Sequence, residues 1–209
     1  CMISVIIPLY NAENTILAAL DSVKNQEGDF DFESLNALNM LNTKYIMAGQ
    51  AENAVFENPQ ANGPAWFPYR IRETKSNDEE IKLIAEINTK QEATINTLEF
   101  QNVKAGSGSI RLEQQSPNQL TYEVNAETAG LVVFSEIYYP LGWKATINGQ
   151  EAEIIRTNYL LRGIEVPTGQ STVEMKFEPE SYYKTKGINV ISQYLWLALF
   201  LVSLFFTFR

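Results

Sequence analysis

The sequence predicts a mainly β protein: a truncated β-loop-α unit, a small α+β region, a seven-stranded β-sandwich and one transmembrane helix. Two observations favour this fold class. Between residues 105 and 180, alternating stretches recur about every 8 to 12 residues between turn signals, as in two-sheet sandwiches. Beyond them, no charged residue occurs from Gly187 to Phe208. The pattern leaves a jelly-roll and an immunoglobulin-like topology open.

The composition excludes several classes of function. With 209 residues, of which 45% are hydrophobic, the chain can bury a sizeable core. Its formal net charge of −9 argues against a nucleic-acid partner, because phosphate binding needs clustered Lys and Arg. There is no His and only one Cys, Cys1, so a Ser-His-Asp triad, a His or thiolate zinc site and an intrachain disulfide are excluded. We expect no cofactor and no metal.

Residues 1–33 differ in character from the rest. The apolar run Ile3–Ile7 predicts a buried strand, Pro8 ends it, and apolar residues then follow at helical spacing. This segment resembles the opening of family 2 glycosyltransferases, and carried over by position Pro8, Tyr10 and Glu13 would face a nucleotide sugar. The next strand and the acidic motifs of those enzymes are missing. A family 2 nucleotide-sugar glycosyltransferase fragment is therefore one alternative function, and the two carboxylates of Asp29–Asp31 are more typical of a solvated turn than of a metal site.

Residues 34–104 predict a small α+β region. We expect a short helix from Asn36 to Asn42 and a helix capped by Asn77, with Glu80 as its capping-box partner. The other expected elements are strands at Tyr45–Ala48, Val55–Glu57 and Ala65–Ile71. Trp66 in the last strand is a candidate sugar platform, although an aromatic in a strand is more often part of the core.

Residues 105–180 predict the sandwich. Ala105–Ser109 is interpreted as a flexible joint, and Asn148-Gly149 as the tight turn of a hairpin, because both residues tolerate positive φ. The expected strands are Ile110–Gln114, Leu120–Val124, Gly130–Ile137, Trp143–Ile147, Ala152–Arg156, Leu160–Val166 and Thr172–Phe177.

The best candidates for a carbohydrate surface are Tyr138, Tyr139, Trp143 and Asn158, because they crowd the turns at one end of the sandwich. Trp66, in the expected strand Ala65–Ile71, is a further candidate. The alternative is that Trp143 packs in the core. Glu136 and Glu165 are the acids that could form a glycosidic pair, which requires carboxylates about 5 to 9 Å apart, but nothing in the sequence indicates that they converge. No catalytic residue is assigned.

The uncharged run from Gly187 to Phe208 predicts a transmembrane helix. At about 1.5 Å per residue it would measure about 33 Å, enough for a bilayer core of about 30 Å. Tyr194 and Trp196 lie toward the N-terminal end of the run, as in an interfacial aromatic belt. The lipid bilayer is therefore an expected partner.

Several motifs give the chain a second resemblance. The segments NALNMLNTKYI (36–46), NPQANGPAWF (58–67), FSEIYYPLGWKATINGQ (134–150), NYLLR (158–162) and FEPESY (177–182) resemble the C-terminal extracytoplasmic region and last membrane helix of YfhO-like bacterial membrane proteins.

That family is regarded as polytopic membrane glycosyltransferases that use lipid-linked sugars. The resemblance implies a non-catalytic accessory domain on the outer face of the bacterial cytoplasmic membrane. Its partners would be the remaining membrane helices of such a protein and a cell-envelope glycan. A membrane-tethered carbohydrate-binding module is the other alternative.

Overall fold

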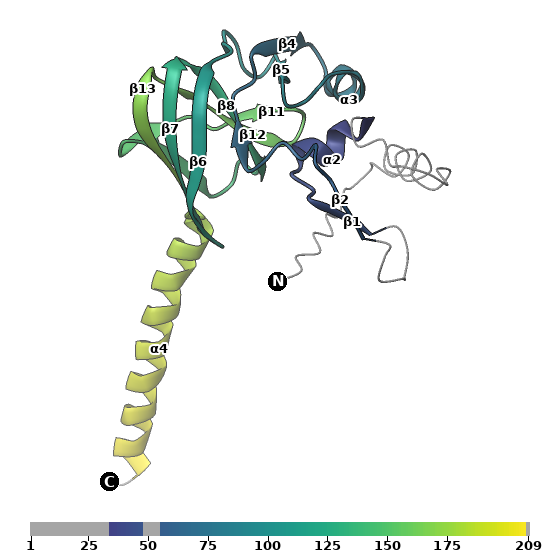
Figure 1. Ribbon diagram of the computed structural model, residues 1–209. Helices are drawn as coiled ribbons and strands as arrows, with labels where there is room; N and C mark the ends of the chain where they lie inside the picture. The colour runs from purple at the N-terminus through teal and green to yellow at the C-terminus, as the bar shows by residue number, and fades with distance from the viewer. Residues whose placement is uncertain (1–33, 48–54, 208–209) are drawn as a thin grey trace.

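The computed structural model describes residues 34–47 and 55–207, and it shows a β-rich body from which one long helix projects (Figure 1). Two antiparallel sheets form the body. One has the strand order β10-β9-β13-β7-β6 and the other the order β11-β12-β8-β3. Their strands are β3 (Ala65–Trp66), β6 (Ser107–Ser116), β7 (Gln119–Thr128), β8 (Gly130–Ile137), β9 (Trp143–Ile147), β10 (Gln150–Ala152), β11 (Ile155–Thr157), β12 (Leu161–Val166) and β13 (Gly169–Phe177).

A smaller α+β part lies beside the second sheet. It contains an antiparallel pair, β1 and β2, and a parallel pair, β4 and β5, with helix α3 between the two parallel strands. The bounds are α2 (Asn36–Met40), β1 (Tyr45–Met47), β2 (Val55–Glu57), β4 (Arg70–Thr74), α3 (Asn77–Glu86) and β5 (Glu92–Asn96). The projecting helix is α4 (Glu180–Thr207), which follows β13 directly.

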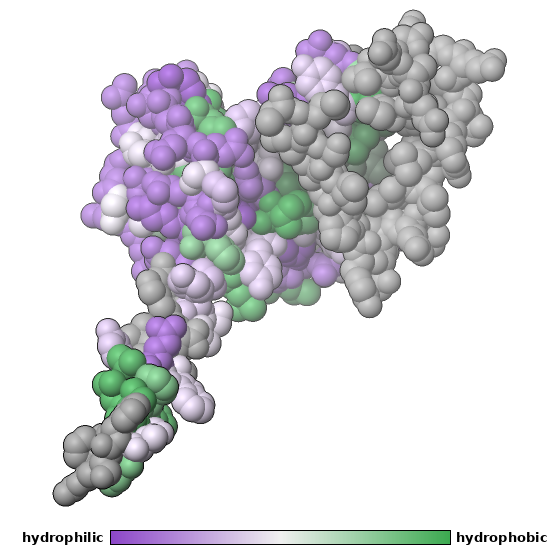
Figure 2. All heavy atoms as spheres, turned by 90° about the horizontal axis from the view of Figure 1, so that it is seen from below, coloured by the Kyte–Doolittle hydropathy of each residue, from purple (hydrophilic) through white to green (hydrophobic). Residues whose placement is uncertain are grey.

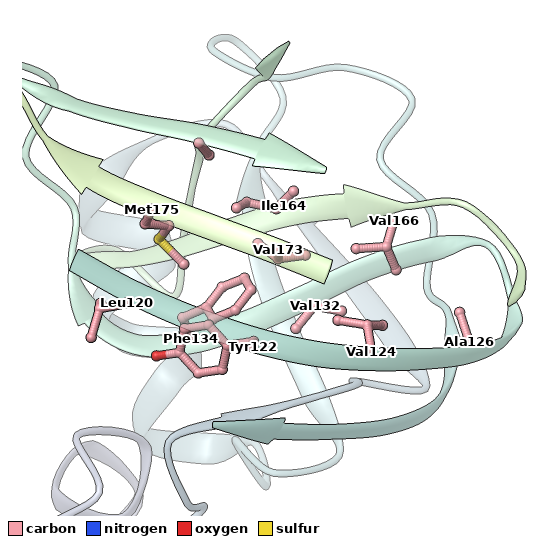
Figure 3. Close-up of a cluster of buried hydrophobic side chains, with 11 residues drawn as sticks. Leu120, Tyr122, Val124, Ala126, Val132, Phe134, Ile164, Val166, Val173 and Met175 are labelled. Atoms are coloured by element: carbon pink, nitrogen blue, oxygen red, sulfur yellow. The ribbon is translucent and has the colours of Figure 1, made fainter. Parts of the chain in front are cut away.

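The two large sheets pack face to face over an apolar core, which confirms a mainly β fold (Figure 3). Alternate residues of β7 and β13 point into this core, as the period of two in a strand requires. Tyr122 of β7 meets Phe134 of β8 edge to face, with ring centroids 4.8 Å apart. Both side chains are almost completely buried. The contact fixes the spacing of the two sheets at the centre of the sandwich.

The second sheet is buried on both faces. On the side away from the first sheet, Leu131 and Val133 of β8 pack against Trp66, Ile84 of α3 and Ile95 of β5. The first five residues of β8 are therefore all buried, although the strand belongs to an antiparallel sheet. The α+β part covers apolar surface that would otherwise face solvent, so the molecule has three layers at this point.

The sheets contain more strands than the seven expected. The expected strand Ala152–Arg156 is two strands, because the chain leaves the first sheet after β10 and joins the second sheet as β11. The expected strand Ala65–Ile71 also divides, into β3 and β4. Pro68 lies between them, and proline has no N–H to donate to a ladder.

The interpretation of Ala105–Ser109 as a flexible joint is wrong. Ala105 bridges to Leu131 and β6 begins at Ser107. The glycines of this stretch serve close packing rather than flexibility, because a Cβ at Gly108 would collide with the backbone of Asn125 on β7.

The hairpin at Asn148-Gly149 is confirmed. Ile147 pairs with Gln150, and φ is 52° at Asn148 and 80° at Gly149, as a tight turn between β9 and β10 requires.

The helix expected after Asn77 is present, but its cap is shifted by one residue. Ser76 is the N-cap and its side chain accepts a hydrogen bond from the backbone N–H of Glu79 at 3.2 Å. Glu79 in turn accepts from the backbone N–H of Lys75 at 2.8 Å. Glu80 is therefore released from the capping role that the sequence predicted, and it points into the interior.

Candidate functional site

A pocket of about 180 Å³ opens at the end of the sandwich from which α4 leaves. Its walls come from the loop between β8 and β9, from β9 itself, and from the stretch around β10. The lining residues are Tyr138, Tyr139, Pro140, Trp143, Lys144, Ala145, Glu151, Ala152 and Ile154. We call this the aromatic pocket. It combines aromatic walls with one cationic side chain, Lys144, and one anionic side chain, Glu151.

Trp143 is held in place by two contacts. The guanidinium carbon of Arg162 lies 3.9 Å from the centroid of the Trp143 ring, and Phe177 lies 5.4 Å away on the neighbouring strand. Arg162 is buried and donates from Nε to the carbonyl of Ile137 at 3.0 Å. Burial lowers the pKa of Arg162, and the nearby carboxylate of Glu136 opposes that shift. The cation covers one face of the indole, so the ring is fixed rather than free to rotate.

The aromatic pocket is joined to the beginning of α4. The backbone N–H of Glu178 donates to the carbonyl of Gly142 at 2.6 Å. Trp143 pairs with Phe177, the last residue of β13. Lys144 lies 3.7 Å from a carboxylate oxygen of Glu178. The loop that forms one wall of the pocket is thus packed on the segment that leads into the helix.

Three of the five predicted carbohydrate-surface residues meet in this pocket, namely Tyr138, Tyr139 and Trp143. The other two do not, so their assignment to a surface is corrected. Trp66 is only 6% exposed because the α+β part covers β3. Asn158 is fully buried, with φ of 46°, and its Oδ1 accepts from the backbone N–H of Thr94 at 2.8 Å. It is a turn residue that ties β11 to β5.

Glu136 and Glu165 do not converge. Glu165 lies opposite Leu131, at one end of the β8–β12 ladder. Glu136 lies near the other end, next to Ile137, and Ile137 pairs with Leu161. At about 3.3 Å per residue the two positions are roughly 16 Å apart along the strand. A glycosidic carboxylate pair needs a much shorter separation. Burial raises the pKa of Glu136, and the charge of Arg162 opposes that shift.

Sequence reasoning missed a charge cluster formed by the buried Glu80, by Arg156 and by the more exposed Glu99. Glu80 is completely buried and accepts hydrogen bonds from Thr94 Oγ1 and from the backbone N–H of Tyr159, both at 2.9 Å. Arg156 reaches Glu80 at 3.2 Å and Glu99 at 2.6 Å. Burial raises the pKa of Glu80, against the opposing effect of these donors and of Arg156. The cluster therefore connects α3 to the turn between β11 and β12 through hydrogen bonds and ion pairs.

One signal in the sequence could have revealed this cluster. Ser76 and Glu79 already form an S-x-x-E capping box, so Glu80 was free for another role. Glu80 also stands four residues before Ile84, on the buried face of the helix.

A second, larger pocket of about 320 Å³ lies between α2 and the end of α3. It is lined mainly by amides and other polar groups. Many of these groups already bind one another or the backbone: Asn36 donates to Ala85 O, Asn62 donates to Thr89, and Asn58 donates to Asn39. We therefore regard the aromatic pocket as the better candidate site.

Two further expectations concern metals and the membrane. No group of three or more metal-binding side chains occurs among residues 34–47 and 55–207. Within the same residues, no helix combines the length and hydropathy required of a membrane span, so the transmembrane helix expected at Gly187–Phe208 is not confirmed.

Pro8, Tyr10, Glu13 and the stretch Asp29–Asp31 lie outside the described residues. The comparisons give no support to the resemblance of residues 2–33 to family 2 glycosyltransferases.

The comparisons with known proteins agree with the second resemblance. Searches of curated proteins and of solved structures find no match. The family described as bacterial membrane protein YfhO matches residues 70–188. This match covers more than half of the chain and includes β4 to β13, the aromatic pocket and the beginning of α4. The chain therefore belongs to the YfhO family of bacterial membrane proteins.

Proposed function

We propose that this chain is a non-catalytic, extracytoplasmic accessory domain of a YfhO membrane protein. In this proposal α4 holds the domain at the bilayer, and the aromatic pocket binds the sugar of a lipid-linked glycan for transfer by membrane-embedded parts of the protein. The observation that carries the proposal is the position of the pocket beside the beginning of α4. A sugar on a lipid carrier projects only a short distance from the membrane, so its binding site must lie close to the surface.

The side chains of α4 support the anchoring role. Every described side chain from Ile191 to Leu204 is exposed, and none of these residues is charged. Leu195 is 61% exposed, Trp196 74% and Phe200 60%. Apolar side chains that surround a projecting helix on all sides are unfavourable in water. Burial in lipid removes that cost, and the membership in a membrane protein family agrees with it.

The chemistry of the aromatic pocket suits a phosphate-linked sugar. Aromatic rings such as Tyr139 and Trp143 pack well against the C–H faces of sugars, and a lysine provides a point charge for a phosphate. Lys144 is available for this role, because its ion pair with Glu178 is long and both side chains are about half exposed. Exposed pairs of this kind contribute about 0 to 1 kcal/mol, so a phosphate can replace the carboxylate.

The proposal is tested by ligand binding to the full chain in nanodiscs, with polyprenyl phosphate glucose as the probe. Polyprenyl phosphate without sugar, and a soluble glucose oligosaccharide, are the comparison ligands. Tyr139→Ala removes an exposed wall of the pocket, and Tyr69→Ala is the matched control, because Tyr69 is also an exposed tyrosine but lies outside the pocket.

We expect the sugar-bearing lipid to bind most tightly, with a loss of about tenfold in Tyr139→Ala, equivalent to about 1.4 kcal/mol, and no loss in Tyr69→Ala. Equal affinities for the lipids with and without sugar would contradict the proposal. Tight binding of the soluble oligosaccharide alone would favour a membrane-tethered carbohydrate-binding module instead.

The outer location of the domain is tested separately. A single cysteine placed at Thr168, in a background in which Cys1 is replaced by serine, should react with a membrane-impermeant maleimide in intact cells. Thr168 is exposed and lies at the end of the sandwich away from α4, just before β13 begins. Labelling only after the cells are lysed would place the domain in the cytoplasm and overturn this part of the proposal.

A further inference from the structure

The loop from Ile137 to Leu141 carries an unusual concentration of exposed apolar surface. Ile137 is 40% exposed, Tyr139 50% and Leu141 67%. By contrast, the turns at the opposite end of the sandwich, residues 127–130 and 167–170, contain no exposed large hydrophobic side chain. Figure 2, which views the molecule from the side of α4, shows apolar surface on the body as well as along the helix. Exposed apolar side chains are thus concentrated in the loop at one end of the sandwich, which we call the apolar loop.

The apolar loop is held rigidly beside α4. At one end the backbone N–H of Tyr138 donates to the carbonyl of Leu160 at 2.7 Å. At the other end Gly142 accepts from Glu178, two residues before α4 begins. A Cβ at Gly142 would approach Phe177 to 2.9 Å and Pro179 to 3.1 Å, so the loop and the helix entry are in close contact. The loop therefore keeps a fixed position relative to the beginning of the helix.

We propose that this loop is a second membrane contact, with Tyr139 and Leu141 inserted into the interfacial region of the same bilayer that holds α4. This inference rests on the proposed function, because it assumes that α4 is the anchor. A tyrosine next to a proline and a leucine suits the interface, where an aromatic ring sits at the headgroups and an aliphatic side chain reaches the upper acyl chains. Lys144 at the edge of the pocket then lies at the level of the lipid phosphates.

Two contacts with the bilayer, one through α4 and one through the apolar loop, restrict the orientation of the domain far more than one contact does. A single helix would leave the domain free to tilt, together with the helix, relative to the bilayer. With the loop inserted, the tilt is fixed, and the mouth of the aromatic pocket faces the headgroup layer. Tyr139 belongs to both the loop and the pocket, so membrane insertion and sugar binding would share one side chain.

The experiment places an environment-sensitive fluorophore, NBD, on single cysteines of the full chain, with Cys1 replaced by serine. The chain is reconstituted in phosphatidylcholine and phosphatidylglycerol vesicles, with and without lipids that carry a quencher in their acyl chains. Leu141→Cys reports on the loop and Leu197→Cys on α4. Leu98→Cys is the matched control, since Leu98 is an exposed leucine, 75% accessible, in the turn after β5, a strand of the α+β part.

We expect a blue shift and loss of emission by acyl-chain quenchers at positions 141 and 197, and neither effect at position 98. If position 197 is quenched but position 141 behaves like position 98, the loop proposal is overturned while the anchor remains. If position 197 is not quenched, the anchoring role of α4 fails, and the loop proposal fails with it. Quenching at all three positions would mean that the domain adsorbs to lipid without a preferred face, which also overturns the proposal.

Discussion

Replacement of Glu80 by alanine should destabilise the folded chain more than replacement of Glu99, the other carboxylate that binds Arg156. Glu80 has no exposed surface, and its Oε1 atom accepts from both Thr94 Oγ1 and the backbone N–H of Tyr159. Its other oxygen receives the guanidinium of Arg156 at 3.2 Å. Glu80→Ala removes all three interactions together.

The expected loss of stability can be worked out from the groups that Glu80→Ala leaves without a partner. A buried donor without a partner costs about 1 to 3 kcal/mol, and Glu80→Ala leaves two of them. Loss of one partner of a buried ion pair costs about 3 to 5 kcal/mol, but here the cost is reduced because Arg156 keeps Glu99 at 2.6 Å. These costs overlap, since they describe the same desolvated groups. We expect the free energy of unfolding to fall by about 3 kcal/mol or more.

The assay is urea unfolding of the detergent-solubilised chain, followed by tryptophan fluorescence. Two control variants separate the loss of the hydrogen-bond acceptor from the loss of the negative charge. Glu80→Gln keeps an acceptor for Tyr159 and Thr94 but loses the charge, so it should lose less than half as much stability as Glu80→Ala. Glu99→Ala removes a carboxylate that is 43% exposed, and it should cost about 1 kcal/mol or less. The reasoning is refuted if Glu80→Ala and Glu99→Ala unfold at the same urea concentration.

Two further predictions concern the turn at Gly149 and the carboxyl of Glu136. Gly149→Val should lower stability by about 1 to 2 kcal/mol, because φ is 80° there and no neighbouring atom lies within 4 Å to add a steric effect. Gly149→Asn should cost clearly less, and equal melting temperatures for wild type and Gly149→Val would disprove the turn strain. Burial raises the pKa of Glu136 above its ordinary value of 4.5, so its ionisation removes stability as the pH rises from that value through the folded-state pKa. The stability gained by Glu136→Gln should therefore grow from pH 4 to neutrality, and a gain independent of pH would contradict this.

Much of the sandwich was predictable because its strands obey a local rule. β7 and β13 alternate more buried and less buried side chains, and Asn148-Gly149 is a turn signal that depends only on its own two residues. The change of sheet between β10 and β11 was not predictable in this way. The residues around Glu153 and Ile154 keep an alternating pattern, and which sheet each strand joins is decided by contacts distant in the sequence.

The candidate site was predictable only in part, for a related reason. Tyr138, Tyr139 and Trp143 are close in sequence and share one turn region, so their convergence was expected. Trp66 and Asn158 have the same kinds of side chain as surface ligands, and only the α+β part that packs over them makes them interior residues. Glu80 shows the converse: a charged residue in the first turn of a helix is ordinarily exposed, and its burial depends on Arg156 and Tyr159, far away in the sequence.

The central claim is that α4 anchors the domain in a bilayer, and flotation of the full chain with lipid vesicles tests it most directly. The decisive variant carries Leu197→Arg together with Leu201→Arg, and its matched control carries phenylalanine at both positions. Arginine and leucine have similar helix propensities, so the helix itself is preserved, but each substitution should oppose insertion by about 3 kcal/mol, or about 6 kcal/mol together. The account predicts that the wild type and the phenylalanine variant float with the vesicles, while the arginine variant stays at the bottom of the gradient. Flotation of the arginine variant to the same extent as the wild type would contradict it.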